Sequence, residues 1–317
     1  MSDTIVFLDR DTTDRGDLDL SELESLGNVV YHGITRPEEI SERIAVANIV
    51  LTNKVVIKGE EMDAASDLKL IQIVATGVNN VDLDAARERE LAVCNVSGYS
   101  TESVVQHVFA SLLNLETNVH RFASEKHLWP KSPIFTRLNY PINELSGKTL
   151  GIVGLGAIGK AVARVGTAFG MKIVALAREG GSTGAIPRLP AKEFFAVSDV
   201  VTLHCPLTLD THHFINSETL GMMKNSAILI NTGRGDLINE PHLVTALENG
   251  TIRAAAVDVV TPEPPPVDHP LIAAALNNLL VTPHTAWSSL EARQRLVDKI
   301  VDNIKAFRRS EKLNRII

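Results

Sequence analysis

The sequence predicts an α/β protein with two doubly wound parallel sheets, in which the segment that forms one sheet is inserted into the sequence of the other. Three observations support this fold class. Strand-like and helix-like runs alternate over residues 4–95. A strand, a glycine turn, a helix and a second strand follow one another over residues 147–178. An amphipathic run over residues 288–309 predicts a last helix that returns to pack on the first domain.

The composition is that of an ordinary globular protein and excludes several classes. The chain has 317 residues, of which 44% are hydrophobic, enough for a core in each of two domains. A net charge of -7 argues against non-specific binding to nucleic acid. No apolar run approaches the ~18 residues of a membrane helix, and we expect a cytoplasmic protein. Cys94 and Cys205 lack nearby partners, so we expect buried thiols and neither a disulfide nor a metal site.

The first domain is expected to hold five strands, with helices such as 37–47 and 81–89 between them. Because no glycine fingerprint follows its first strand, this half is not expected to hold a nucleotide. The strand-like runs are 5–8, 29–31, 49–52, 70–75 and 91–94.

Two loops of this half follow strands and are candidates for ligand contact, since ligands of open parallel sheets meet the carboxyl ends of the strands. Asn53 follows the third strand, and Thr76 and Gly77 follow the fourth. The backbone of Thr76 and Gly77 could bind a carboxylate through its N–H groups. The alternative is a plain turn in which Asp82 caps the next helix. The residues leave both interpretations open.

The chain is expected to cross into the second domain through a hinge at residues 96–100. Thr101 then has the residue type of an N-cap for a long helix with Val104, Val108 and Leu112 on its buried side. Residues 125–146 contain three prolines and are expected to be an irregular segment that wraps the surface or a partner subunit.

The glycine turn of residues 147–178 has the spacing G-x-G-x-x-G, formed by Gly154, Gly156 and Gly159. The first glycine allows a tight turn, the second lets a pyrophosphate approach the backbone, and the third lets helix and strand pack closely. The N-terminus of the following helix would direct its N–H groups at the phosphates. The motif therefore predicts dinucleotide binding; the alternative is a turn that only packs the helix on the strand.

This motif places the nucleotide in the second domain. We expect residues 100–287 to form a Rossmann-like dinucleotide-binding domain and residues 1–99 and 288–317 to form the other domain. Residues 262–270 are rich in proline and are expected to be a loop. The further strands expected in the second domain are 199–203, 227–231, 254–257 and 279–282.

Three of these strands are followed by side chains that can perform acid–base and anion-binding chemistry. Arg234, Glu263 and His284 each follow a different strand and would emerge at the edge of the sheet where the dinucleotide binds. Each taken alone is better explained as a surface or packing residue, but together, beside a dinucleotide loop, they favour a catalytic group. Other histidines, such as His107 and His213, have no such company and are expected to be structural, as is His204.

These motifs resemble those of the D-isomer-specific 2-hydroxyacid dehydrogenases over essentially the whole chain. The resemblance is carried by the glycine loop, by Thr-Gly-Arg-Gly at 232–235, by the Asp258 to Pro264 segment and by Pro-His-Thr-Ala-Trp at 283–287. The segments Leu-Thr-Asn-Lys-Val at 51–55 and Glu-Pro-Pro-Pro at 263–266 are most similar to the glycerate dehydrogenase (hydroxypyruvate reductase) branch.

The resemblance implies a role for each candidate residue. His284 would donate a proton to the developing alkoxide, Glu263 would orient His284, and Arg234 would hold the substrate carboxylate or carbonyl. Asn53, Thr76 and Gly77 would join Arg234 in binding the substrate, so the resemblance implies that residues 1–99 and 288–317 form a substrate-binding lid domain. Asp258 would hold the nicotinamide carboxamide. The implied cofactor contacts are Thr101, Gly154, Gly156, Ala157, Ile158, Gly159, Arg178, Cys205, Pro206, Thr211, Thr232, Gly233, Asp258 and His284.

The sequence departs from an NAD-specific pattern after the second strand of the glycine motif. An acidic residue that binds the ribose hydroxyls is expected there, but the chain has Ala177, followed by Arg178 and Glu179. Arg178 could bind the 2′-phosphate of NADP or stack on adenine, and Glu179 could replace the missing acid. We expect NAD or NADP as the cofactor, with NADP at least tolerated.

The resemblance thus predicts an NAD(P)-dependent enzyme that reduces a small 2-keto acid to a D-2-hydroxy acid, with hydroxypyruvate or glyoxylate as the expected substrate. It also implies a homodimer. The alternatives are a D-lactate-type or phosphoglycerate-type dehydrogenase, or a nicotinamide-sensing binding protein of the corepressor kind.

Overall fold

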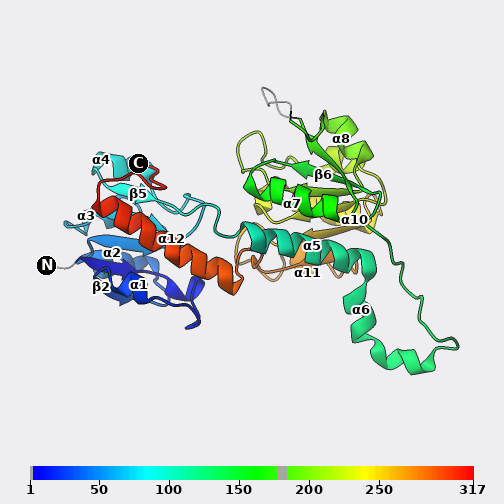
Figure 1. Ribbon diagram of the computed structural model, residues 1–317, viewed down its shortest axis with the longest axis horizontal. Helices are drawn as coiled ribbons and strands as arrows, with labels where there is room; N and C mark the ends of the chain where they lie inside the picture. The colour runs from blue at the N-terminus through cyan, green and yellow to red at the C-terminus, as the bar shows by residue number, and fades with distance from the viewer. Residues whose placement is uncertain (1–2, 178–183) are drawn as a thin grey trace. The chain divides into compact units, whose positions relative to one another are not determined.

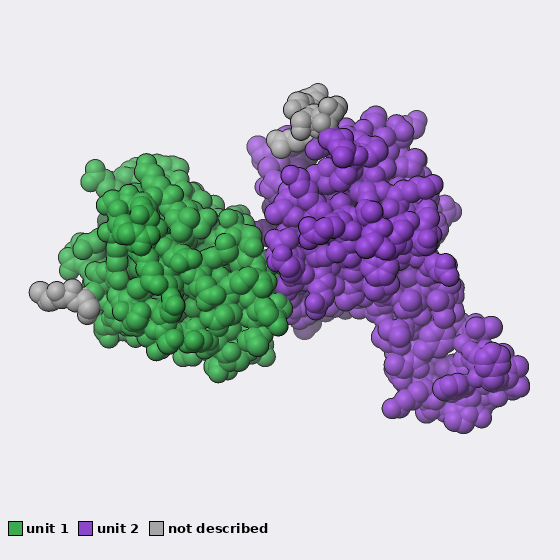
Figure 2. Space-filling view, viewed as in Figure 1, with its two compact units in different colours: residues 1–100, 287–317 green, residues 101–286 purple. Residues whose placement is uncertain are grey.

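The computed structural model describes residues 3–177 and 184–317 (Figure 1). It divides into two compact units, which Figure 2 shows in different colours: unit 1 comprises residues 1–100 and 287–317, and unit 2 comprises residues 101–286. Each unit contains one parallel sheet covered by helices, so the expected fold class is confirmed. The boundaries expected from the sequence lie one residue from these, and the ligand of each unit stays a prediction.

Unit 1 has a five-stranded sheet in the order β2-β1-β3-β4-β5, and every neighbouring pair of strands is parallel. The central strands β3 and β4 are buried at every position, which matches their nearly continuous apolar sequence. The strands are β1 (Thr4–Phe7), β2 (Asn28–Tyr31), β3 (Ile49–Thr52), β4 (Leu70–Ile73) and β5 (Ala92–Cys94).

Helices cover both faces of this sheet. One face packs against α1 and α12 through Leu23, Leu296 and Ile300. The other face packs against α2, α3 and α4 through residues that include Ile44 and Met62. The helical segments are η1 (Arg10–Thr12), α1 (Ser21–Glu24), η2 (Pro37–Glu39), α2 (Ile40–Ile44), α3 (Gly59–Asp63), α4 (Leu83–Glu88) and α12 (Leu290–Arg308). The last helix therefore returns to unit 1, as the sequence predicts.

Unit 2 has a seven-stranded parallel sheet in the order β12-β11-β10-β9-β6-β7-β8. The strand order reverses between β6 and β9, because β7 and β8 continue to one side of β6 while β9 to β12 continue to the other. The strands are β6 (Thr149–Val153), β7 (Lys172–Leu176), β8 (Arg188–Leu189), β9 (Val200–Leu203), β10 (Ile228–Asn231), β11 (Ala254–Val257) and β12 (Leu279–Val281).

The helices of unit 2 are divided between the two faces of its sheet. The helices α5 and α7 supply apolar residues to one face, and α8, α9, α10 and α11 supply them to the other. The helical segments are α5 (Thr101–Thr117), α6 (Val119–Ser124), η3 (Lys126–Lys131), α7 (Ala157–Ala168), α8 (Ala191–Val197), α9 (Ser217–Gly221), η4 (Gly235–Leu237), α10 (Glu240–Glu248) and α11 (Pro270–Ala273).

Two of the helix boundaries show how local sequence sets these elements. The hydroxyl of Ser289 accepts a hydrogen bond from Ala292 N–H and caps α12, and the side chain of Asn239 caps α10 in the same way. The expectation that Thr101 is an N-cap is wrong, because α5 begins at Thr101 itself. Sequence patterns place a helix end only to within one or two residues.

Residues 119–142 form an arm of unit 2, containing α6 and η3, that extends away from the body of that unit (Figure 1). The expectation of an irregular segment over 125–146 holds except for the 3₁₀ helix η3. Several large apolar side chains of this arm are exposed, among them Phe135, which is 90% exposed, and Leu138, which is 75% exposed. Exposed apolar side chains gathered on one segment are typical of an interaction surface.

Both cysteines are free thiols, as expected from the sequence. Cys94 is buried, and burial raises the pKa of its thiol to about 11. Cys205 is only partly buried, so the expectation of a fully buried thiol is wrong for that residue.

Within residues 3–177 and 184–317, none of the helices combines the length and the apolar character that crossing a bilayer requires.

The imidazole of His204, at the end of β9, predicts a pH dependence of stability. Burial lowers the pKa of His204 to about 4, against about 6.5 in an unfolded chain. The unfolded state therefore binds a proton that the folded state does not bind. The free energy of unfolding falls as the pH falls from about 6.5 to about 4. Thermal unfolding of wild type and His204→Gln across this range should show a steeper loss of Tm in wild type. Parallel profiles would contradict a neutral His204.

Candidate active site

The three strands that precede the candidate catalytic residues lie side by side in the sheet of unit 2. The strands β10, β11 and β12 are parallel neighbours, so their carboxyl ends reach one edge of the sheet. Arg234 follows β10, Glu263 follows β11 and His284 follows β12. The topology therefore brings the three loops to a common edge, where ligands of doubly wound sheets bind.

His284 and Glu263 form a direct imidazole–carboxylate pair. His284 Nδ1 lies 2.7 Å from Glu263 Oε2. Because an ionised carboxylate can only accept a hydrogen bond, Nδ1 carries the proton and donates it. The opposite ring nitrogen, Nε2, has no hydrogen-bond partner within the described residues. It is thus the nitrogen able to exchange a proton with a ligand, and the side chains of both residues are about one-third exposed (28% and 33%).

A buried carboxylate holds the turn that carries His284. Asp258 is 2% exposed and accepts hydrogen bonds from Thr282 Oγ1 (2.6 Å), Thr285 N–H (2.9 Å) and Ala286 N–H (2.8 Å). Its backbone carbonyl accepts a fourth from His284 N–H at 2.7 Å. Both carboxylate oxygens therefore serve the 282–286 turn. The expected contact of Asp258 with a nicotinamide carboxamide stays a prediction.

His107 is a member of this site that the sequence did not single out. It lies on α5, and its Nε2 is 3.1 Å from Thr282 Oγ1 and 3.6 Å from Asp258 Oδ1. Because the Thr282 hydroxyl donates to Asp258, its oxygen can accept a hydrogen bond from His107. The expectation that His107 lacks company near the site is therefore wrong. Its spacing along α5 gave no signal, since its partners lie far away in the sequence.

Arg234 lies in a loop that is held by the side chain of Asn231, the last residue of β10. The Asn231 side chain donates to the carbonyl of Arg234 (2.8 Å) and accepts from Gly233 N–H (2.9 Å). The guanidinium is exposed and donates to the carbonyl of Gly233 at 2.8 Å. An exposed, permanently charged group at this edge can bind an anionic ligand.

The glycine loop lies at the point where the strand order reverses. Gly154 has φ +97°, and a Cβ there would lie 2.7 Å from Cys205 N and from the His204 carbonyl. A Cβ on Gly159 would lie 2.0 Å from Gly154 O, whereas the space above Gly156 is open. The first and third glycines thus allow close packing and the second leaves room for a ligand, as the motif predicts. Among the described residues no side chain caps α7, so its first N–H groups are available to a ligand.

The other expected cofactor contacts stay predictions, and the structure describes their local surroundings. Thr232 Oγ1 is buried without a hydrogen-bond partner among the described residues, which marks it as a group awaiting a ligand or solvent. The hydroxyl of Thr211 donates to the carbonyl of Pro206 at 2.8 Å and closes the loop after β9. Ala157 and Ile158 form the first turn of α7, and Thr101 begins α5. Arg178 and Glu179 lie outside the described residues.

The sheet of unit 1 also reverses its strand order, between β1 and β3, but there a side chain fills the position. Asp9, which follows β1 and is 2% exposed, accepts hydrogen bonds from the N–H groups of Asn53 (2.9 Å), Lys54 (2.6 Å) and Val55 (3.2 Å). Burial raises the pKa of Asp9 in spite of these donors. The Asn53 amide donates to Thr12 Oγ1 at 2.9 Å. The backbone N–H groups of this loop are therefore satisfied internally.

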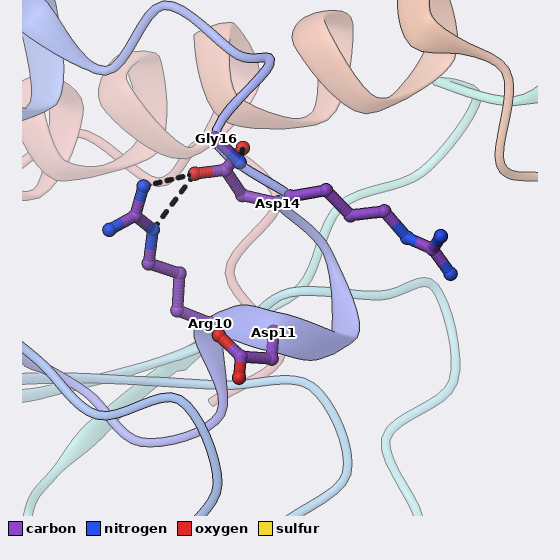
Figure 3. A pocket seen from close by; sticks show the side chains of 5 residues that line it. Arg10, Asp11, Asp14 and Gly16 are labelled. Atoms are coloured by element: carbon purple, nitrogen blue, oxygen red, sulfur yellow. Dashed lines mark hydrogen bonds and ion pairs between the residues drawn. The ribbon is translucent and has the colours of Figure 1, made fainter.

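A shallow cavity of about 520 Å³ lies beside this position, at the segment that follows β1. Figure 3 shows its lining, in which the guanidinium of Arg10 reaches the carboxylate of Asp14 and the second cation is Arg15. The same carboxylate accepts the N–H of Gly16 at 2.8 Å. Because the lining holds two arginines and two aspartates, Asp11 and Asp14, its charges balance and the cavity offers no strong attraction to an anion.

The second candidate loop of unit 1 is held at one end by a helix cap. Asp82 accepts Ala85 N–H at 2.9 Å and caps α4, which confirms the turn-and-cap alternative for that end. Thr76 is exposed and donates through its hydroxyl to Val96 O at 2.8 Å. Binding of a carboxylate by the N–H groups of Thr76 and Gly77 stays a prediction.

The described residues also contain one group of possible metal ligands, His212, His213 and Asp236. The first of these is exposed, and the backbone N–H of His213 donates to the carbonyl of Asp236 at 2.7 Å. The sequence-based expectation of no metal site stays a prediction.

Comparison with known proteins identifies the family. Residues 109–286 match the family described as D-isomer specific 2-hydroxyacid dehydrogenase, NAD binding domain. The chain belongs to this family. It is 40% identical to a glycerate dehydrogenase of Methylorubrum extorquens, with 97% of this chain and 96% of that protein covered. It is 37% identical to a hydroxypyruvate reductase of Blautia hydrogenotrophica, with 98% of each chain covered.

The fold of this 2-hydroxyacid dehydrogenase is shared by solved structures. One is an acyclic imino acid reductase in complex with NADPH and D-Arg, which is 28% identical and has a TM-score of 0.86, with 99% of this chain and 100% of that chain covered. The resemblance stated from the motifs is thus confirmed. The protein is an oxidoreductase of the D-2-hydroxyacid dehydrogenase type, and its cofactor is a nicotinamide nucleotide.

Proposed function

We propose that this 2-hydroxyacid dehydrogenase reduces a small 2-keto acid, hydroxypyruvate or glyoxylate, to the D-2-hydroxy acid. The observation that carries the proposal is the His284–Glu263 pair, which leaves Nε2 available for proton transfer at the edge that also holds the loop of Arg234. The names of the relatives, glycerate dehydrogenase and hydroxypyruvate reductase, support this substrate class.

In the proposed mechanism each residue acts at a stated atom. The guanidinium of Arg234 binds the substrate carboxylate and polarises the neighbouring carbonyl. His284 Nε2 donates a proton to the carbonyl oxygen as it becomes an alkoxide, while Glu263 holds the ring in one orientation. A nicotinamide cofactor, when bound, would supply the hydride to the carbonyl carbon. In unit 1, the N–H groups of Thr76 and Gly77 are proposed to bind the second carboxylate oxygen, and Asn53 is proposed to contact the substrate through its side-chain oxygen.

Two alternatives to this activity can be told apart by enzyme assays. A D-lactate-type or phosphoglycerate-type dehydrogenase would share the same three residues and differ only in substrate. A nicotinamide-sensing binding protein would bind NADH without oxidising it. Steady-state rates with hydroxypyruvate, glyoxylate, pyruvate and phosphohydroxypyruvate, each with NADH and NADPH, separate these cases.

Replacing His284 tests the proton donor. We expect His284→Gln to lower kcat for hydroxypyruvate by ~10²–10⁴-fold, because an amide cannot supply the proton. The Kd for NADH, measured by fluorescence titration, separates loss of the proton donor from loss of the cofactor contact implied for His284. His127→Gln on the arm is the matched control and should keep wild-type turnover. Near wild-type kcat in His284→Gln would move the proton donor to another residue.

The preference between the two nicotinamide cofactors is proposed from the sequence after β7. We propose that both are accepted, because Ala177 occupies the position where an acid would repel the 2′-phosphate of NADP, and Arg178 follows it. Arg178→Ala should lower kcat/KM for NADPH by ~10-fold or more and leave kcat/KM for NADH nearly unchanged, since a charge-assisted contact to phosphate is lost. Lys192→Ala, an exposed cation on α8, is the control for a change in net charge. Equal effects on both cofactors would remove Arg178 from this role.

We further propose that the enzyme is a homodimer in which the arm of residues 119–142 contacts the partner. The exposure of Phe135 and Leu138 supports this interface. The double change Phe135→Asp and Leu138→Asp should convert the dimer to a monomer in light scattering, because two charges cannot be buried there without partners. Val46→Asp, at an exposed apolar position of unit 1, should leave the dimer intact. A wild-type monomer, or a variant that stays dimeric, would contradict the proposal. A cytoplasmic location stays a prediction.

A further inference from the structure

A second imidazole–carboxylate pair lies behind the loop that carries Glu263. His269 Nε2 is 2.8 Å from Glu240 Oε2. Both residues are almost fully buried, with 4% and 8% of their surface exposed. Their elements are far apart in the sequence, since Glu240 begins α10 and His269 precedes α11. Burial of this kind is rare for ionisable side chains unless each is paired.

The hydrogen bonds of this pair fix its protonation. His269 Nδ1 accepts the N–H of Leu271 at 3.3 Å, so the ring proton is on Nε2. That proton faces Glu240 Oε2 and, at 3.1 Å, the carbonyl of Thr261. The second oxygen of Glu240 accepts Thr261 N–H at 3.1 Å. The pair therefore holds both the N–H and the carbonyl of a single residue, Thr261.

A path of one backbone link and two hydrogen bonds runs from this residue to the imidazole of His284. Thr261 is joined directly to Val260, whose N–H donates to Glu263 Oε1 at 3.2 Å. The other oxygen of the same carboxylate, Oε2, accepts from His284 Nδ1 at 2.7 Å. The orientation of the Glu263 carboxylate thus depends on where the backbone of Val260 and Thr261 lies.

The loop of Arg234 meets the same backbone. A Cβ on Gly235 would lie 2.4 Å from Thr261 Oγ1 and 2.4 Å from the carbonyl carbon of Val260, so no side chain fits between the two loops. From Gly235 the chain runs through η4 to Glu240, which returns to hold Thr261. The loop of Arg234 and the loop of Glu263 therefore pack against each other at Gly235 and Thr261.

We propose that Glu240 and His269 are positioning residues for catalysis: by holding the backbone of residues 260 and 261, they set the Glu263 carboxylate against His284. Neither side chain touches the reacting atoms. The proposal rests on the proposed function only for its kinetic consequence, since the structural consequence, a well-ordered His284–Glu263 hydrogen bond, can be measured without substrate.

Two replacements of His269 separate this role from that of an ordinary helix cap. Gln extends its amide N–H to the position of Nε2 and can donate to Glu240, but it loses the acceptor for Leu271 N–H. Asn keeps an acceptor near Nδ1 for Leu271, but it does not reach Glu240. If the pair positions Glu263, His269→Gln should preserve function and His269→Asn should not. If His269 only caps α11, the order should be reversed.

The first measurement is the proton NMR signal of the Nδ1–H of His284, assigned by its loss in His284→Gln. We expect this signal to be kept in His269→Gln and to be lost or to exchange rapidly in His269→Asn. An unchanged signal in His269→Asn would overturn the proposal. This result stands whether or not the wild-type enzyme turns over a 2-keto acid, so failure of the proposed function is recognised separately by absent turnover in wild type.

The second measurement is the kinetic one. We expect kcat for hydroxypyruvate to fall by ~10–100-fold in His269→Asn, with the KM for hydroxypyruvate and the Kd for NADH within ~2-fold of wild type, because a small displacement of a catalytic group has effects of this size. His269→Gln should stay within ~3-fold of the wild-type kcat. Equal kcat in the two variants, or an effect on KM alone, would overturn the proposal.

A variant of the carboxylate covers the case in which His269→Asn does not fold. Glu240→Gln keeps an oxygen that accepts Thr261 N–H, but its amide N–H group opposes the proton on His269 Nε2. We expect the same loss of the His284 signal and the same fall in kcat, with Tm followed as a control for stability. A folded Glu240→Gln with a wild-type signal and wild-type kcat would overturn the proposal.

Discussion

The candidate site depends on one buried carboxylate, that of Asp258. The hydroxyl of Thr282 and the N–H groups of Thr285 and Ala286 donate to it, and the backbone carbonyl of Asp258 accepts the N–H of His284. Hydrogen bonds to a charged group contribute about 1.5–3 kcal/mol each, and a buried carboxylate without them would be strongly unfavourable. His284 has φ +52°, a conformation that costs a residue with a side chain about 1–2 kcal/mol. The convergence on Asp258 offsets that cost and keeps the imidazole where Glu263 can reach it.

The two sheets of the protein share one topological feature but differ in what occupies it. Both reverse their strand order, and such a reversal opens a crevice at the carboxyl ends of the strands. In unit 2 the crevice is bordered by glycine, and Gly156 leaves it open. In unit 1 the carboxylate of Asp9 occupies the equivalent place and satisfies three backbone N–H groups. A phosphate would there compete with the carboxyl group of Asp9 for the same backbone N–H groups.

Much of the fold and part of the site could be predicted from the sequence, because they depend on residues that are close together in the sequence. The alternation of apolar runs gives the strands, and the spacing of Gly154, Gly156 and Gly159 gives the turn. Arg234, Glu263 and His284 could be selected because each follows a strand, and parallel strands present their ends to one edge. The family followed from the same motifs and is confirmed over nearly the full chain.

What could not be predicted depends on contacts between distant parts of the chain. Asp9 lies 44 residues from Asn53, and nothing near it in the sequence signals that it binds that loop. The same holds for His107 and for the Glu240–His269 pair, whose partners come from other elements. The beginning of α5 at Thr101 was missed for a different reason, since threonine serves equally as a cap and as a first helical residue.

The contact between Gly235 and the backbone of Val260 and Thr261 has a consequence for how such an enzyme can diversify. The loop of Arg234 is proposed to bind the substrate, and the loop of Glu263 is proposed to orient the proton donor. The two loops pack against each other at Gly235, so neither can shift without displacing the other. A change of substrate preference that moved the Arg234 loop would therefore disturb proton transfer at the same time.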